Sequence, residues 1–174
     1  MLVNPALFIL PHNEIQEYGI DNLIYGSLTD KGLATMTATI LRWMPSAETH
    51  YGLDLGCGDG ELAYQLQRVM RGSTWEGVEI SEHRISCQMR DVTIWQGDML
   101  AENLRPYNIL HADNLCLTDS IASDLEEKIA TEFSGLYISY RKAENISFLK
   151  KAVLLGTVPT ETTWTVHSIY YYWL

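Results

Sequence analysis

The sequence predicts an α/β fold in which a doubly wound, mostly parallel, seven-stranded sheet is covered by helices on both faces. Two observations lead to this prediction. From about residue 49 onward, short apolar runs alternate with amphipathic segments at intervals that suit βαβ units. The last two strand-like segments follow one another without room for a crossover helix, which predicts an antiparallel hairpin at the C-terminal edge of the sheet.

Each expected element follows from a local pattern. Short apolar runs predict strands over residues 51–55, 75–80, 92–95, 109–112, 135–140, 152–156 and 164–173. Apolar residues spaced three and four apart predict helices over residues 30–43, 61–71 and 121–131. We expect one domain over residues 1–174, with residues 1–45 forming an N-terminal helical or lid segment.

Composition excludes several classes of protein. The 174 residues are 47% apolar, which is enough for a buried core. A net charge of −10 disfavours direct nucleic-acid binding, because phosphate contacts need a basic surface. The same charge favours a basic protein as partner, although solubility explains it equally well. Three widely spaced cysteines predict no metal site and a reduced, intracellular setting.

Membrane and secretion signals are not expected from this sequence. No apolar run approaches about 18 residues, so no membrane span is predicted. The apolar run near the N-terminus is cut short by Pro11 and lacks a basic region before it, which disfavours a signal peptide. The oligomeric state stays open.

The most informative motif is the run Asp-Leu-Gly-Cys-Gly-Asp-Gly over residues 54–60, between the first strand and its helix. Glycines allow the backbone to turn tightly and to approach a ligand closely. The glycines at 56, 58 and 60 do not fit the dinucleotide pattern Gly-x-Gly-x-x-Gly, and no phosphate-binding Gly-Lys-Ser/Thr follows. The acid Asp54 would repel a pyrophosphate and suits a cationic amino group.

Two further motifs follow at the ends of the next strands. Glu79 ends the second strand about 20 residues after the glycine turn, where a carboxylate can accept hydrogen bonds from both ribose hydroxyls. Asp98 follows the third strand and could accept a hydrogen bond from an adenine amine, while Met99 packs on the ring. Ligands of such sheets bind at the carboxyl ends of the strands, where all three motifs lie.

Together these motifs resemble those of the Rossmann-like (class I) S-adenosylmethionine-dependent methyltransferases. The resemblance is clearest over residues 50–115. It implies that S-adenosylmethionine is the cofactor and that its pocket is formed by Tyr25, Asp54, Gly56, Gly58, Glu61, Glu79, Asp98, Met99 and Asp113.

The acceptor site should follow the fourth strand, where the sequence reads Asp-Asn-Leu-Cys-Leu from Asp113. This stretch is similar to the Asn-Asn-Phe-Ala-Phe of the Dot-one type (disruptor of telomeric silencing) histone-lysine methyltransferases. Further similarities to that family are Tyr25-Gly26, Gly-Asp-Met-Leu over 97–100, and Trp-Thr followed by Ser to Tyr-Tyr over 164–172. The resemblance implies lysine N-methylation of a histone or another basic protein, with Asp113, Asn114 and Tyr171 as catalytic residues.

One departure from that family bears on mechanism. Asp113 stands where the family has asparagine, and a carboxylate would attract an incoming ammonium group and then take part in removing its proton. Two other functions stay open: an N-methyltransferase for a small amine or a nucleobase, and a non-catalytic methyltransferase-like binding subunit. A lid over the pocket would favour the small acceptor.

Overall fold

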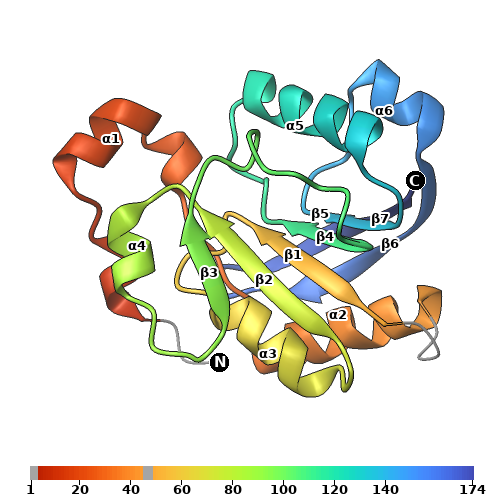
Figure 1. Ribbon diagram of the computed structural model, residues 1–174, viewed down its shortest axis with the longest axis horizontal. Coiled ribbons are helices and arrows are strands. Elements are labelled where there is room, and N and C mark those ends of the chain that lie inside the picture. The colour runs from red at the N-terminus through yellow and green to blue at the C-terminus, as the bar shows by residue number, and fades with distance from the viewer. Residues whose placement is uncertain (1–3, 45–48) are drawn as a thin grey trace.

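A computed structural model describes residues 4–44 and 49–174, and its centre is a twisted seven-stranded sheet (Figure 1). The strand order is β3-β2-β1-β4-β5-β7-β6. Strands β1 to β5 are mutually parallel, whereas β7 is antiparallel to both of its neighbours. The predicted sheet with its antiparallel C-terminal hairpin is therefore confirmed. The strands are β1 Tyr51–Leu55, β2 Thr74–Glu79, β3 Thr93–Gln96, β4 Ile109–Ala112, β5 Leu136–Ser139, β6 Val153–Glu161 and β7 Val166–Trp173.

Helices cover both faces of the sheet, as Figure 1 shows. On one face, α2 (Asp30–Trp43) and α3 (Glu61–Val69) bury Met36 and Leu66 in a core that includes Trp75. On the other face, α5 (Asp119–Glu132) and α6 (Ile146–Lys151) bury Leu125 and Phe148. The predicted helices correspond to α2, α3 and α5, with ends displaced by at most two residues.

Several short helices are absent from the sequence-based prediction. The N-terminal residues form η1 (Pro5–Phe8), α1 (His12–Tyr18) and η2 (Asp21–Leu23), and α4 (Glu82–Ser86) follows β2. We refer to residues 4–29 as the N-terminal cover. Its last part runs beside the turn of the β6–β7 hairpin, where Leu28 forms an antiparallel bridge with Thr162.

The strand order locates the ligand-binding edge. The chain moves outward from β1 through β2 to β3 and then returns to the other side of β1 with β4. Such a reversal leaves a crevice at the carboxyl ends of the two central strands, which is where these folds bind ligands. Within the described ranges, no helix combines the length and apolar character needed to cross a membrane.

Candidate active site

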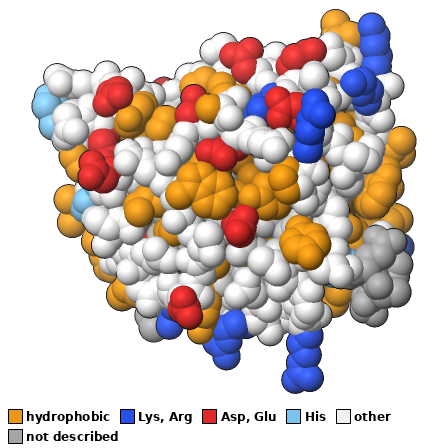
Figure 2. Space-filling model, in the orientation of Figure 1, with side chains coloured by type: hydrophobic (Ala, Val, Ile, Leu, Met, Phe, Trp, Pro, Cys, Tyr) orange, Lys and Arg blue, Asp and Glu red, His pale blue; other side chains and the backbone are white. Residues whose placement is uncertain are grey.

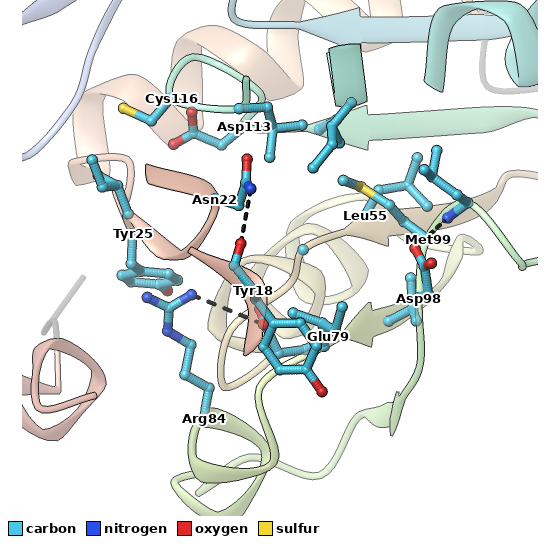
Figure 3. Close-up of a pocket in the computed structure, with 18 of the residues that line it drawn as sticks. Tyr18, Asn22, Tyr25, Leu55, Glu79, Arg84, Asp98, Met99, Asp113 and Cys116 are labelled. Atoms are coloured by element: carbon cyan, nitrogen blue, oxygen red, sulfur yellow. Dashed lines mark hydrogen bonds and ion pairs between the residues drawn. The ribbon is translucent and has the colours of Figure 1, made fainter. Parts of the chain in front are cut away.

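A cavity of about 360 Å³ lies at this edge of the sheet (Figure 3). We call it the main cavity. It is lined by the carboxyl ends of β1, β2 and β4, by the loop after β3 and by the N-terminal cover. Its volume falls within the range of roughly 300–1,000 Å³ that is usual for small-molecule sites.

One end of the main cavity is built around Glu79. Its two carboxylate oxygens accept hydrogen bonds from the backbone N–H groups of Gly58, at 2.8 Å, and Ser81, at 2.9 Å. Burial raises the pKa of Glu79, and the charge of Arg84 opposes this shift. Figure 3 shows Asp98 and Met99 on the far side of Glu79 from Tyr25, so the three predicted nucleotide-binding residues line one cavity.

The glycine turn shapes the floor of the site. Gly56, Gly58 and Gly60 all have positive φ angles, of 79°, 59° and 78°. A Cβ at Gly56 would meet no atom within 4 Å, which leaves room for a ligand beside the turn. A Cβ at Gly58 would lie 2.3 Å from Cε2 of Tyr25, so the cover packs directly on the turn.

Arg84 attaches the cover to the cavity. Its guanidinium donates hydrogen bonds to the carbonyls of Leu7 and Leu23, and it lies 5.3 Å from the ring centroid of Tyr25. The same group is 3.9 Å from Glu79. Among the described residues that line the main cavity, Arg84 alone carries a positive charge, and the carboxylate of Glu79 lies next to it.

A second, smaller cavity adjoins the main cavity at the end of β4, and we call it the inner cavity. Tyr25, Gly26, Gly56 and Asp113 line both cavities. Burial raises the pKa of Asp113, and the charge of His111 opposes the shift. The carboxyl of Asp113 therefore stands at the junction of the two spaces.

The structure places five predicted site residues outside the main cavity. Asp54 lines only the inner cavity, and its carboxylate pairs with His111. The carboxylate of Glu61 accepts hydrogen bonds from Gln65 and from Arg90 in the loop before β3, each at 2.7 Å. Gly58 acts through its N–H group on Glu79 rather than by lining the space. Contact of Asp54, Gly58 and Glu61 with the cofactor therefore stays a prediction. The fourth and fifth residues, Asn114 and Tyr171, are described next.

The two other proposed acceptor residues are buried in the fold. Asn114 is 0% exposed, and its Oδ1 accepts hydrogen bonds from the N–H groups of Tyr140, at 2.9 Å, and Arg141, at 3.2 Å. Tyr171 is also 0% exposed and packs in the core on the side of α2 and α3. Neither side chain lines the main or the inner cavity, so neither faces the space that an acceptor would enter there. Asn114 instead holds the backbone after β5.

Sequence reasoning missed the residues supplied by the cover and by α4, notably Tyr18, Asn22 and Arg84. It also gave no role to His111, although a usable signal existed. His111 and Asp113 are two residues apart on β4 and its continuation, so their side chains leave the strand on the same face. Among the described residues, no group of three or more His, Cys, Asp or Glu side chains is placed to hold a metal ion.

Comparison with known protein families identifies a family for this chain. The family model described as "Methionine biosynthesis protein MetW" matches residues 35–132, which is more than half of the chain. The matched segment begins within α2 and ends with α5, so it contains the glycine turn and the ends of β2, β3 and β4. No curated protein sequence matches the chain. The earlier resemblance to the Dot-one type finds no support in these comparisons.

Solved structures share the fold. Magnesium protoporphyrin IX methyltransferase from Synechocystis, solved with bound SAH, is 14% identical, with a TM-score of 0.61 and 81% of each chain covered. Geranyl diphosphate C-methyltransferase from Streptomyces coelicolor is 13% identical, with a TM-score of 0.57, and 80% of this chain and 75% of that chain are covered. A TehB-like methyltransferase from Corynebacterium glutamicum is 15% identical, with a TM-score of 0.55 and coverages of 82% and 88%. The chain therefore has the Rossmann-like methyltransferase fold.

Proposed function

Because the chain belongs to the family of the methionine biosynthesis protein MetW, we propose that it is an S-adenosylmethionine-dependent methyltransferase whose acceptor is a small amine. The cofactor supplies an activated methyl group and a sulfur leaving group. The protein has to bind this cofactor, orient the acceptor and exclude water. The arrangement of the main cavity supports each of these tasks.

The residues of the main cavity fit this cofactor. Two of the four lone-pair positions of Glu79 are taken by backbone N–H groups, which leaves the others for ribose hydroxyls. Asp98 and Met99 lie beyond Glu79, where an adenine ring would reach. Gly56 lines the same cavity with open space beside it, and this space would receive the amino-acid end.

The main evidence for a small acceptor is the position of the N-terminal cover over the site. Tyr25 and Gly26 line both cavities, so the cover lies over the place where an acceptor would meet the methyl group. It is held there at both ends. Glu14 accepts hydrogen bonds from the Ser81 hydroxyl and the His83 N–H group, and Thr163 donates from its N–H group to the Ser27 carbonyl. A covered site favours a small molecule over a folded protein surface.

Charge favours an amine as the methyl acceptor. Asp113 lies between the two cavities, and Glu17 and Asp21 of the cover line the main cavity. An aliphatic amine has a pKa of about 10.4, so its neutral form costs about 4–5 kcal/mol near neutral pH. A buried site lowers this cost because it disfavours the ammonium form. Because the family is described as one of methionine biosynthesis, we include amino acids among the amines to be tested.

A lysine side chain on a basic protein is the second candidate acceptor. The observation that favours it is the charge of the surface: Figure 2 shows acidic side chains over α1 and α5, and the protein carries a net charge of −10. A lysine side chain would have to enter beneath the cover, so this acceptor requires the cover to open.

The test is a radiolabelled methyl-transfer assay on a panel of small amines and amino acids, lysine-containing peptides, core histones and nucleosomes, with Glu79→Ala as the blank. We expect label on a small amine and none in the variant. Label on proteins alone would replace the small acceptor by lysine. An absence of label on every acceptor, with cofactor binding intact, would contradict an amine acceptor.

A further inference from the structure

A buried pair of titratable side chains joins the ends of the two central strands. Asp54 of β1 and His111 of β4 are register partners in the parallel ladder, and each is at most 3% exposed. Their side chains meet in a hydrogen bond of 2.7 Å between Nδ1 of His111 and Oδ1 of Asp54. Where Asp54 is a carboxylate it can only accept, which assigns the donor role in this bond to Nδ1 of His111.

The other ring nitrogen of His111 has no partner among the described protein atoms. Its Nε2 is buried and makes no hydrogen bond. A buried polar atom without a partner destabilises a fold, and among the described atoms of this kind Nε2 of His111 belongs to a residue that lines one of the two cavities. His111 lines the inner cavity, and the Tyr140 ring meets it edge-on at 5.4 Å between centroids. The inner cavity has a volume of about 20 Å³, which is room for one group the size of a water or an amino group, so the lone pair of Nε2 is available to such a group alone.

From this geometry we infer that His111 is the catalytic base of the reaction and that Asp54 is its positioning residue. The inference rests on the proposed function, which it deepens by naming the group that takes the proton. Asp54 fixes the tautomer with the proton on Nδ1 and stabilises the imidazolium that forms.

The step balances in atoms and charge. An acceptor that arrives as an ammonium first passes one N–H proton to Nε2 of His111, which becomes an imidazolium paired with Asp54. The lone pair freed on the acceptor nitrogen then forms the new N–CH₃ bond, and the electron pair of the broken S–CH₃ bond stays on the leaving sulfur. Asp113, which lines both cavities, attracts the cationic form of the acceptor, and His111 takes the proton. The imidazolium releases the proton to solvent before the next turnover.

Other titratable groups face His111 and belong in any pH profile. The inner cavity is lined by Tyr25 from the cover, Cys57 from the glycine turn, Asp113 after β4 and Tyr140 after β5, in addition to Asp54. Burial raises the pKa of both tyrosines and of the Cys57 thiol well above their ordinary values. Those three groups therefore stay neutral across the neutral range.

The test uses His111→Asn, because the asparagine amide can still donate to Asp54 in place of Nδ1 while Nε2 is lost. We expect an unchanged affinity for S-adenosylmethionine in calorimetry and a kcat that falls by about 10²- to 10⁴-fold. The acidic limb of the pH–rate profile should disappear. His12→Asn, the same substitution at an exposed histidine, is the matched control and should leave the kinetics unchanged.

A spectroscopic measurement tests the pair without turnover. In ¹⁵N NMR of the protein with S-adenosylmethionine bound, His111 should show a protonated Nδ1 and an unprotonated Nε2. In Asp54→Asn the amide can donate to Nδ1, which moves the proton to Nε2 and should lower kcat as well. A His111→Asn variant that retains its rate and pH profile, or a tautomer with the proton on Nε2 in the parent protein, overturns the inference. If the parent protein neither binds S-adenosylmethionine nor transfers methyl groups, the proposed function itself fails.

Discussion

Replacing Gly58 with alanine adds one methyl group where both the backbone and a neighbouring side chain resist it. Gly58 has a φ of +59°, in the left-handed region that costs other residues about 1–2 kcal/mol. The new Cβ would also lie 2.3 Å from Cε2 of Tyr25, and overpacking of this kind costs about 1–3 kcal/mol. We therefore expect Gly58→Ala to lower the free energy of unfolding by about 2–5 kcal/mol.

The two contributions can be separated. In a Tyr25→Ala background the steric conflict is gone, so Gly58→Ala should cost only the backbone part of about 1–2 kcal/mol. The difference between the two backgrounds, a coupling of about 1–3 kcal/mol, measures the contact between the cover and the glycine turn. Gly72→Ala is the matched control, because Gly72 has a φ of +84° and a Cβ there would meet nothing within 4 Å.

The free energy of unfolding is measured by urea titration of the four proteins of this cycle and of Gly72→Ala in both backgrounds. Each cost is taken from the shift of the unfolding midpoint, provided that the slope stays constant. Gly72→Ala should cost about 1–2 kcal/mol irrespective of residue 25. If Gly58→Ala lowers the free energy of unfolding by the same amount with and without the Tyr25 ring, the cover does not pack on the turn as described.

Three further predictions concern buried polar groups of the site. Burial raises the pKa of Asp113, so the folded protein favours the protonated carboxyl. The stability that this preference contributes is complete below the unfolded pKa of about 3.9 and is lost as the pH rises through the raised pKa of the folded state. Asp113→Asn should thus raise the Tm at pH 7.5, with a gain that shrinks toward pH 4; a gain equal at all pH values would contradict this. Arg84→Met leaves Glu79 without its cation and should cost about 3–5 kcal/mol, with faster hydrogen exchange across the N-terminal cover. Unchanged exchange there would show that Arg84 does not hold the cover. Asn114→Ala leaves the buried N–H group of Tyr140 unpaired and should cost at least about 1–3 kcal/mol in urea unfolding, while a neutral result would contradict its structural role.

The parts of the site that the sequence could predict are local ones. The glycine turn, Glu79 and Asp98 each follow directly from a strand end, and the carboxyl ends of parallel strands necessarily meet at one edge. Residue order along the chain was therefore enough to bring them together. The same reasoning located all seven strands, because apolar runs of four to eight residues are a local signal.

The cover could not be predicted because its contacts join distant parts of the chain. Glu14 and Ser81 are 67 residues apart, and Arg84 reaches a carbonyl 61 residues before it. Neither contact leaves a periodic pattern in the sequence. The short 3₁₀ helices and α1 owe their positions to these contacts rather than to a strong apolar stripe.

The position of Tyr171 shows a second limit of sequence reasoning. Residues of β7 alternate between the two faces of the sheet, so Tyr170 and Tyr172 pack on the side of α5 while Tyr171 packs on the side of α2. A run of aromatic residues predicts such a strand equally well in either register. Which tyrosine approaches a site depends on the register with β5, which the sequence does not specify.

The central claim is that the main cavity binds S-adenosylmethionine through Glu79. A calorimetric titration of the parent protein, of Glu79→Gln and of the control Glu82→Gln, which changes an exposed glutamate three residues later, tests it most directly. We expect the parent protein and the control to bind one equivalent with equal affinity. Loss of hydrogen bonds to a charged group, worth about 1.5–3 kcal/mol, should weaken binding to Glu79→Gln at least about tenfold. No binding by the parent protein, or equal binding by all three proteins, would contradict the claim.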